Sequence, residues 1–436
     1  MKKIKIEANQ EQKELTGKQA FFQNIDYSRA LQLSTCVRCG LCAQSCHYYL
    51  TDREVKSIPA YKISLVGRVF LYYFGFQRKF WSWWLGSQKL DSSNLDEWTN
   101  ILFGRCSLCG RCSLNCPMGI KIHDLVRFGR SILARLEVMP QGLASTIKTA
   151  LIFDNNMGIK PEEWVETVKW LEQELRIERG SSSLFFPLDR FGAKILYAIN
   201  PREAKFFPLS LLAVGQIFSE AQESWTLSSF NYDATNYAYF LGDDKLAAKF
   251  FKRLEASMKR LGCQILVLTE CGHGFNAARW ESPGWLGYRP EFEIKNVLEI
   301  VAEYVKEGKL KLDPSRHKLP VTLHDPCNLV RLGGLLEEAR FLLKKAVTHF
   351  VEMTPHGIEN FCCGGGGGQL AMTEFASQRL KAGKLKAEQI KKTGAKIVVA
   401  PCHNCLDQLL ELNRFYQLGI QVKTVCEVVA EALIVG

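Results

Sequence analysis

The chain has 436 residues, 47% of them hydrophobic and 23% charged, which suits folded domains and leaves room for two or three of them. Its net charge is +11, but the basic residues are spread along the chain, which disfavours a nucleic-acid-binding protein with a clustered basic footprint. No apolar run reaches the roughly 18 residues that span a bilayer, and the start, MKKIKIEANQEQ, lacks the apolar core of a secretory signal. We therefore expect a cytoplasmic protein whose 16 cysteines stay reduced and are free to bind metal.

The sequence divides into segments of different pattern. Two groups of cysteines are followed by an amphipathic helical stretch, and then by short apolar runs that alternate with amphipathic helices. This pattern predicts an α+β multidomain chain, helical first and α/β afterwards. The expected segments are a lead-in (1–30), a cysteine-rich helical domain (31–139), a helical linker (140–185) and two α/β halves (186–312 and 313–436).

Two cysteine motifs of the same spacing lie in the first domain. CVRCGLCAQSC and CSLCGRCSLNCP both follow the Cys-x-x-Cys-x-x-Cys-x-x-x-Cys run of two-cluster ferredoxins. Three close thiolates can wrap one 4Fe–4S cube, and the fourth cysteine reaches the other cube. The spacing predicts two cubane 4Fe–4S clusters: cluster one is held by Cys36, Cys39, Cys42 and Cys116, and cluster two by Cys106, Cys109, Cys112 and Cys46.

Zinc is the main alternative, but zinc sites use pairs of cysteines, whereas these motifs are triads plus one. The first motif ends in Cys46-His47, where the second ends in Cys116-Pro117. We expect His47 to flank the cluster and make local hydrogen bonds, with tuning of the cluster as the alternative. The 59 residues between Cys46 and Cys106 exceed the spacing in compact bacterial ferredoxins. The arrangement resembles the helical ferredoxin domains of succinate dehydrogenase-type and heterodisulfide reductase-type subunits.

An aromatic segment, KISLVGRVFLYYFGFQRKFWSWWLG (62–86), separates the two motifs and has nine aromatic residues. Its simplest interpretation is a helix packed on the cysteine-rich domain. The alternative is a docking face for a membrane partner around Trp81, Trp83 and Trp84, because Trp and Tyr flanked by Arg and Lys suit bilayer interfaces.

The α/β part contains an internal repeat. A shift of 132 residues places 245–268 on 377–400, so that a helix, its terminal glycine and the following apolar run match. The runs ILVL (265–268) and IVVA (397–400) predict buried parallel strands. A repeat of this size indicates a duplicated subdomain.

A second group of cysteines lies in the last half, in HDPCN, FCCGGGGG and PCHNC. The two adjacent cysteines can serve neighbouring irons of an open cluster, and the glycines that follow let the backbone approach closely. A phosphate-binding loop is disfavoured because no Lys-Ser/Thr follows the glycines, and no dinucleotide-binding fingerprint is present, so we expect no flavin or NAD.

This group, spaced as Cys, Cys-Cys-Gly and Cys-x-x-Cys, resembles the CCG domain of heterodisulfide reductases. Together with the two-cluster domain, it makes nearly the whole chain similar to the D subunits of membrane-bound heterodisulfide reductases. The resemblance implies a noncubane 4Fe–4S cluster that cleaves disulfides, with Cys327, Cys362, Cys363, Cys402 and Cys405 as its ligands and catalytic residues.

One departure from that family concerns the first α/β half. The 132-residue shift places Phe230 and Asn231 opposite the Cys-Cys pair, and Glu270 and His273 opposite Cys402 and Cys405, so this half lacks the cysteine set that methanogen reductases keep. The motifs CHYYL, NYDATNY, TECGHG and HDPCNL resemble the K subunits of the dissimilatory sulfite reductase-linked complex (DsrMKJOP) and of related sulfate-reducer transmembrane complexes. That resemblance implies a small sulfur-carrier protein as a partner.

Three cysteines fall outside these groups. Cys263 and Cys426 stand beside apolar runs, which predicts core thiols. Cys271, in ECGHG, is either a core thiol or a residue at the mouth of the cluster site, together with Glu270 and His273. Histidine and aspartate also flank the expected ligands, at His324, Asp325 and His403, where proton delivery and local hydrogen bonding are both open.

The resemblance implies an oxidoreductase acting on sulfur groups, peripheral on the inner face of the cell membrane. It would pass electrons between a quinone-linked cytochrome b-type subunit and a disulfide or thiol substrate. Two alternatives remain: the iron–sulfur subunit of a quinone-linked glycerol-3-phosphate or lactate/glycolate dehydrogenase, or a non-catalytic electron relay.

Overall fold

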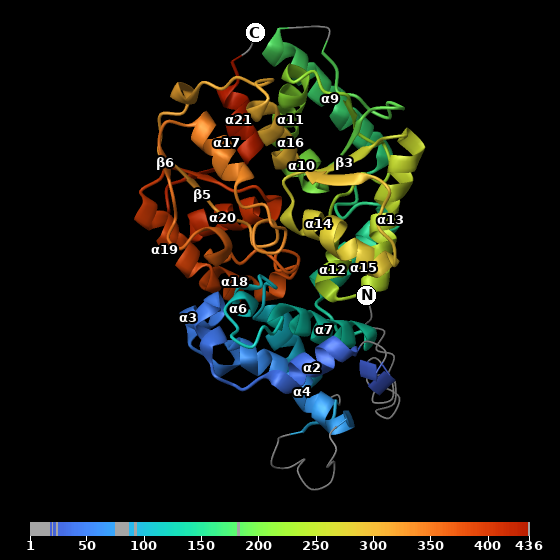
Figure 1. The fold of residues 1–436 in the computed structure, drawn as a ribbon, viewed down its shortest axis with the longest axis vertical. Coiled ribbons are helices and arrows are strands. Elements are labelled where there is room, and N and C mark those ends of the chain that lie inside the picture. Colours follow the sequence, from blue (N-terminus) through green and yellow to red (C-terminus); the bar gives the residue numbers. More distant parts are fainter. Residues whose placement is uncertain are drawn as a thin grey trace, which may run out of the picture. The chain divides into compact units, whose positions relative to one another are not determined.

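The computed structural model describes residues 18–19, 21–22, 25–74, 87–90, 94–180 and 184–434 (Figure 1). The tryptophans of the predicted docking face, Trp81, Trp83 and Trp84, lie outside these residues. The chain forms two compact units. The first comprises residues up to Ala144 with Phe240–Asp243 and Gly367–Ala382, and the second comprises Ser145–Tyr239, Asp244–Gly366 and Gly383–Gly436. In the described part of the chain, no helix is long and apolar enough to cross a membrane.

The first unit is helical. Helices α4 and α7 pack against each other and bury apolar residues at helical spacing, such as Val66 and Val69 on α4 and Leu125 on α7. The packing is close, because a Cβ on Gly129 of α7 would lie 3.0 Å from Val66 Cγ2. The α-helices of this unit are α2 (Tyr27–Thr35), α3 (His47–Asp52), α4 (Pro59–Phe74), α5 (Leu95–Thr99), α6 (Arg111–Leu114), α7 (Ile122–Arg135) and α18 (Ala376–Ala382), with α8 (Gln141–Phe153) beginning here.

Residues Gly367–Ala382 complete the first unit although they come from the last part of the sequence. Their helix α18 contacts α3, and the Gln369 amide donates a 3.1 Å hydrogen bond to the Cys106 carbonyl. Ala382 packs against Cys46 and Tyr48. The cysteine-rich helical unit is therefore built from separated stretches of sequence.

The second unit contains two parallel sheets of the same strand order. The first is β2-β1-β3-β4 and the second is β6-β5-β7-β8, with every neighbouring pair parallel. The strands of the first sheet are β1 (Ile195–Ala198), β2 (Trp225–Thr226), β3 (Ile265–Leu268) and β4 (Glu293–Asn296). Those of the second are β5 (Val321–Leu323), β6 (Phe350–Val351), β7 (Ile397–Val399) and β8 (Gln421–Lys423). The identical order confirms the predicted duplication, and the central strands β3 and β7 coincide with the predicted apolar runs.

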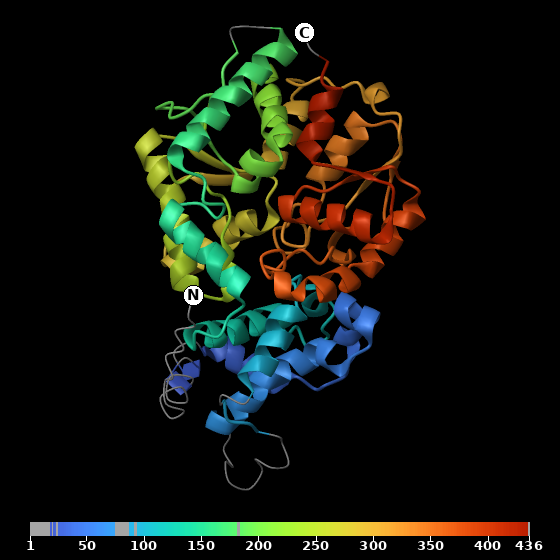
Figure 2. The same ribbon diagram turned by 180° about the vertical axis from the view of Figure 1, so that it is seen from behind.

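Helices join the two halves of this unit through a shared apolar core. Figures 1 and 2 show α11, α16, α17 and α21 side by side between the sheets, and α11 and α17 both contact α21. Buried Ile217, Leu342 and Val429 belong to one continuous cluster. The helices of this unit are α9 (Pro161–Arg179), α10 (Pro201–Phe206), α11 (Pro208–Glu220), α12 (Tyr237–Leu241, ending in the first unit), α13 (Asp244–Leu261), α14 (Gly272–Asn276), α15 (Ser282–Leu286), α16 (Val297–Lys306), α17 (Glu338–Ala346), α19 (Lys384–Thr393), α20 (His403–Tyr416) and α21 (Val425–Ala432).

The stretch expected to be a helical linker contributes to this core. Helix α9 buries Trp164, Val168 and Leu171 on one face, and the Trp164 indole stacks on Tyr232 at 4.7 Å between ring centroids. The Trp164 Nε1–H donates to the Ser228 carbonyl at 3.0 Å. Because these side chains are fully packed, α9 is part of the α/β unit.

We predict that Gly142→Ala destabilises the first unit by about 1–3 kcal/mol, the usual cost of overpacking. A Cβ at Gly142 would lie 1.7 Å from the Ala371 carbonyl oxygen, and backbone on both sides leaves no flexible group to move. The control is Gly67→Ala in helix α4, where a Cβ has no neighbour within 4 Å and should gain helix propensity. Anaerobic thermal unfolding followed by circular dichroism measures both, and equal melting temperatures for the two variants would contradict the prediction.

Candidate metal centres

The two cysteine motifs of the first unit share one local backbone conformation. Arg38 and Leu108 have φ of 56° and 52°, and Gly40 and Gly110 follow with φ of 80° and 75°. These left-handed turns bend each Cys-x-x-Cys-x-x-Cys loop back on itself, which points its three sulfurs to one side. Glycine at the second turn removes the steric cost of that conformation.

Four cysteines line a first cavity in this unit, together with Ile63 and Ile120. They are Cys36, Cys39, Cys42 and Cys116. Burial raises the pKa of the Cys42 thiol to about 11, and the thiolates of Cys36, Cys116 and Cys39 raise it as well because like charges repel. Thiolates crowded in this way need a bound cation such as iron, so the residues present fit a metal cluster.

The other four cysteines line a second cavity, which also includes His123, Lys62 and Tyr48. They are Cys46, Cys106, Cys109 and Cys112. Burial and the thiolates of Cys109, Cys46 and Cys106 hold the pKa of Cys112 well above its usual value. The fourth cysteine of each motif thus lies with the first three of the other, the juxtaposition that the predicted ligand sets require.

Sequence analysis missed two buried cations near this group of cysteines: Lys62, which lines the second cavity, and Arg130, which donates to the Cys106 carbonyl. The Lys62 Nζ lies 3.7 Å from Cys46 Sγ and donates to the Arg105 carbonyl, and the field of the surrounding thiolates raises its pKa although burial alone would lower it. Arg130 is fully buried and donates to four carbonyls: Leu102 (2.9 Å), Phe240 (3.0 Å), Gly367 (2.8 Å) and Cys106 (2.6 Å).

In the described part of the chain, neither Lys62 nor Arg130 forms an ion pair with a carboxylate. A buried charge without a counter-charge is costly, so the balance must come from the cysteine thiolates. The sequence does carry a signal for Lys62. It precedes Leu65, Val66 and Val69 at helical spacing, so it is a charge on an apolar face.

The CCG cysteines stand at the carboxyl edge of the second sheet. Cys327 comes four residues after β5, and Cys402 is the N-cap of α20, three residues after β7. Because β5 and β7 are parallel neighbours, these two ends meet at one edge, where ligands of α/β sheets usually bind. The Cys362–Cys363 loop follows β6, the neighbour of β5 on its other side.

All five of these cysteines are buried, and their sulfurs have close partners. Cys363 Sγ lies 3.4 Å from Cys405 Sγ, and the Gly365 and Gly364 amides point at Cys363 Sγ (3.5 Å) and Cys362 Sγ (3.3 Å). Hydrogen bonds from the neighbouring thiols and from the Gly365 N–H hold the pKa of Cys363 well below its usual value. The Cys327 Sγ accepts a hydrogen bond from the side-chain amide of Asn328, whose Nδ2 is 3.7 Å away. A loop that stabilises thiolates in a dry pocket fits an iron–sulfur cluster.

Two further side chains belong to this site: His324, which was predicted to flank the ligands, and Lys386, which was not predicted. One ring nitrogen of His324 lies within 4.8 Å of the sulfurs of Cys363 and Cys405. Lys386 is fully buried, and burial lowers its pKa to about 8, although the charges of Asp325 and of Cys363, Cys362 and Cys405 favour its protonated form. The carboxylate of Asp325, next to His324, forms a bidentate salt bridge with the Arg340 guanidinium, with both contacts at 2.7 Å. It therefore stabilises the loop and is not free for proton delivery.

The first half has the same edge with different residues. Cys271 is the N-cap of α14 after β3, as Cys402 is the N-cap of α20 after β7. Structurally equivalent residues of the two halves are therefore 131 positions apart in the sequence here. The 132-residue shift that set Glu270 opposite Cys402 is wrong at this point. The Glu270 carboxylate instead accepts from the Val425 and Cys426 amides (2.9 and 2.8 Å) at the start of α21 and does not face a cluster.

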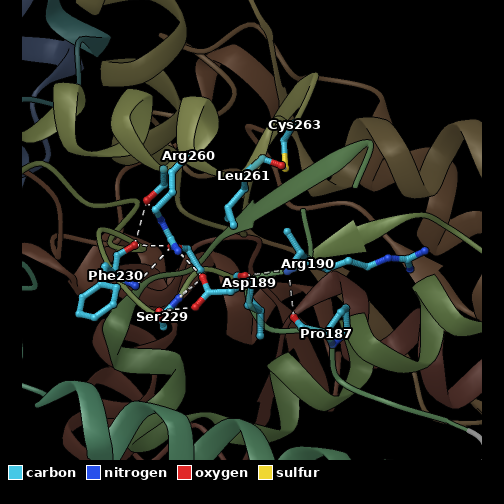
Figure 3. Close-up of polar contacts among 12 residues, drawn as sticks. Pro187, Asp189, Arg190, Ser229, Phe230, Arg260, Leu261 and Cys263 are labelled. Atoms are coloured by element: carbon cyan, nitrogen blue, oxygen red, sulfur yellow. Dashed lines mark hydrogen bonds and ion pairs between the residues drawn. The ribbon is translucent and has the colours of Figure 1, made fainter. Parts of the chain in front are cut away.

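The loop that replaces the Cys-Cys pair is held by a polar network (Figure 3). Asp189 accepts from the Ser229 amide at 3.1 Å and from Arg260 Nη2 at 2.6 Å, and Ser257 Oγ donates to the Phe230 carbonyl at 2.9 Å. Phe230 itself is exposed. This half therefore presents hydrogen-bonded side chains at the position where the other half presents thiolates.

The remaining cysteines differ in burial. Cys426 is 1% exposed within the shared core, whereas Cys263 is half-buried at the edge of a smaller core with its Sγ 3.9 Å from the Leu261 carbonyl (Figure 3). Cys271 is fully buried, with its Sγ 3.4 Å from His273 Nδ1. Both ring nitrogens of His403 have hydrogen-bond partners, the Glu270 carbonyl (3.1 Å) and the Ser210 hydroxyl (3.3 Å).

Comparison with known proteins finds one domain match at each of the two groups of cysteines. Residues 32–120 match the 4Fe–4S dicluster domain, and residues 321–410 match the cysteine-rich domain CCG. The chain is 28% identical to an Hdr-like menaquinol oxidoreductase iron–sulfur subunit of Archaeoglobus profundus, over 95% of this chain and 82% of that protein. It is 26% identical to the D subunit of the dihydromethanophenazine:CoB–CoM heterodisulfide reductase of Methanosarcina mazei, over 94% of this chain and 96% of that protein.

A third relative is the EtfAB:quinone oxidoreductase of Syntrophomonas wolfei, 24% identical over 89% of this chain and 56% of that protein. The relatives from Archaeoglobus and Methanosarcina span both units, and the two domain matches fall on the two cysteine groups. The chain is similar to heterodisulfide reductase D subunits along nearly its whole length, and it combines a 4Fe–4S dicluster domain with a CCG domain.

Proposed function

We propose that this chain is the iron–sulfur subunit of a membrane-associated, quinone-linked complex that exchanges electrons with a disulfide or thiol substrate at the CCG site. The observation that carries the proposal is the set of buried CCG thiols at the carboxyl edge of the second sheet, with Cys363 and Cys405 sulfurs 3.4 Å apart. The relative from Archaeoglobus is named as a menaquinol oxidoreductase subunit, which supports the quinone link. The relative from Methanosarcina is named as a heterodisulfide reductase subunit, which supports the disulfide substrate.

The proposed ligands follow from the two cavities and the sheet edge. The first cavity would hold one cubane 4Fe–4S cluster on Cys36, Cys39, Cys42 and Cys116, and the second another on Cys46, Cys106, Cys109 and Cys112. The CCG site would hold a noncubane 4Fe–4S cluster on Cys327, Cys362, Cys363, Cys402 and Cys405. When bound, that noncubane group supplies one-electron chemistry at an iron site open to a sulfur ligand.

This chain's own residues prepare the CCG site for an anionic sulfur. The Gly364 and Gly365 amides donate toward the Cys-Cys pair, and the charge of the buried Lys386 interacts favourably with the thiolates of that pair. Burial excludes water, which strengthens each of these interactions. The cubane cavities instead have four cysteines each, a complete set for electron transfer without substrate binding.

The proposed partners are a cytochrome b-type membrane subunit and a disulfide or thiol substrate, for which a small sulfur-carrier protein is our specific hypothesis. The likeness to the EtfAB:quinone oxidoreductase of Syntrophomonas wolfei favours one alternative, the iron–sulfur part of a quinone-linked flavoprotein dehydrogenase. Co-purification distinguishes them: a haem-containing membrane subunit supports the first function, and a flavoprotein supports the second.

We predict about twelve irons per chain, because each of three clusters holds four. In Cys363→Ser the iron content should fall to about eight while both cubane signals in electron paramagnetic resonance persist. Cys263→Ser is the matched control, since Cys263 lies at the edge of a core away from the five CCG cysteines, and it should keep all its iron. Anaerobic iron and sulfide analysis measures this. About eight irons in the unchanged protein would leave the CCG site without a cluster, and about sixteen would place a cluster in the first half.

A second prediction concerns Lys62, whose charge lies beside Cys46 in a buried cavity. Lys62→Met should lower the reduction potential of one cubane by ~50–100 mV, since a buried charge a few ångströms away is worth about 1–2 kcal/mol. The other cubane, in the first cavity, should stay within ~20 mV because screening weakens distant charges. Potentiometric titration followed by electron paramagnetic resonance measures both.

The control for this measurement is Lys56→Met on the same stretch of chain, where the ammonium is half-exposed and paired with Glu97 at 2.9 Å. Solvent screens that charge, so both potentials should stay as they are. Equal shifts of the two cubanes in Lys62→Met, or none at all, would contradict the placement of Lys62 at one cluster.

A further inference from the structure

A chain of three buried side chains ends at the sulfurs of the CCG site. Lys386 Nζ donates to Asn360 Oδ1 at 2.6 Å, and Asn360 Nδ2 lies 3.3 Å from His324 Nδ1. One ring nitrogen of His324 lies within 4.8 Å of Cys363 Sγ and of Cys405 Sγ. All three of these side chains are at most 2% exposed, so water does not compete for their hydrogen bonds.

The direction of each hydrogen bond in this chain is fixed by chemistry. A lysine ammonium can only donate, so the Asn360 atom that it contacts must be the carbonyl oxygen. The other Asn360 atom is therefore the NH₂ group, which donates to the Asp325 carbonyl at 2.9 Å and to His324 Nδ1. His324 Nδ1 is then an acceptor, and the proton of a neutral imidazole must be on Nε2.

The Nε2 atom of His324 is buried and has no hydrogen-bond partner among the residues that the structure describes. An unsatisfied N–H in the interior is costly, and it is retained where an additional group completes it. The sulfurs of Cys363 and Cys405 lie within 4.8 Å of a nitrogen of this ring, so these sulfurs and a group bound beside them are candidate acceptors. An N–H donor stabilises a thiolate or a sulfur ligand that carries negative charge.

We propose that Lys386 and Asn360 are positioning residues that fix the Nε2–H tautomer of His324, and that this N–H donates to sulfur at the Cys363–Cys405 edge of the CCG site. The inference rests on the proposed function, because it assumes a cluster on these cysteines. It assigns three residues a role in setting how readily the site accepts an electron. A donor to sulfur favours the reduced, more negative form of the site, so removing it should lower the reduction potential.

The main test compares His324→Leu with Asn360→Asp in the full chain carrying its clusters. His324→Leu removes the donor. Asn360→Asp is nearly isosteric, but its carboxylate accepts from His324 Nδ1–H and so moves the proton away from Nε2. Each should change the ratio of reduced to oxidised CCG cluster at a fixed potential about fivefold, which is ~40 mV at 59 mV per tenfold. An exchangeable proton coupled to the cluster, seen by electron–nuclear double resonance and lost in D₂O, should be missing from both variants.

Two further variants complete this test. His324→Gln keeps an N–H donor of similar reach and should restore part of the proton coupling. His317→Gln is the control, because His317 is a buried histidine of the same unit that hydrogen-bonds to the Val428 carbonyl at 3.1 Å. It should leave the potential and the coupling unchanged.

Iron analysis separates failure of this inference from failure of the proposed function. If the unchanged protein has about eight irons, the CCG site has no cluster and the proposed function fails with the inference. If His324→Leu and Asn360→Asp keep about twelve irons, an unaltered potential and an unaltered proton coupling, the role of His324 is overturned while the function stands. If His324→Leu loses iron, Asn360→Asp alone decides between these outcomes.

Discussion

The sites of this protein depend on balancing negative sulfur charge in a dry interior. Buried thiolates repel one another and lose the stabilisation of water, which is why the pKa of Cys112 is held well above its usual value. Iron is one source of positive charge, and the chain supplies another. Lys62 is a buried cation 3.7 Å from Cys46 Sγ, and it forms no ion pair with a carboxylate in the described part of the chain. Its charge would be costly in the interior without the thiolates, so this cation and its cysteine group depend on each other. The buried Lys386 is stabilised by the charge of Asp325 as well as by the CCG thiolates.

The duplicated α/β unit shows how one scaffold supports two different edges. Both sheets have the same order and both place a helix N-terminus after a central strand, with Cys271 or Cys402 as the N-cap. In the second half, glycines after the Cys-Cys pair direct amides at sulfur. In the first half, Asp189 and Arg260 fix the corresponding loop through hydrogen bonds and an ion pair. The fold supplies the edge, and the loop residues decide whether that edge collects thiolates.

Much of this architecture was predictable, because cysteine spacing and apolar runs are local signals. The motif spacing grouped the cysteines in the two sets of four that line the two cavities. The runs ILVL and IVVA predicted the central strands, since short buried strands need continuous apolar residues. Lys386, Asn360 and Gln369 were missed because their roles depend on partners far away in sequence. Glu270 was misplaced because a one-residue difference between strand and helix in the two halves changes the equivalence there. The contribution of Gly367–Ala382 to the first unit has no local sequence signal, since α18 resembles any short amphipathic helix.

Arg130 brings these constraints together within the first unit. Its guanidinium donates to the Cys106 carbonyl and to the Gly367 carbonyl, and Gly367 follows Cys363 by only four residues. A Cβ on Gly367 would lie 2.7 Å from the Ser107 carbonyl oxygen, so the two backbones approach as closely as glycine permits. Within this unit, Arg130 therefore holds a cysteine loop of one predicted cluster together with a stretch of chain that lies 237 residues beyond Arg130 in the sequence. Loss of Arg130 would leave four carbonyls without this donor and free both stretches of backbone at once, so the first unit depends on a buried guanidinium that joins its separated segments.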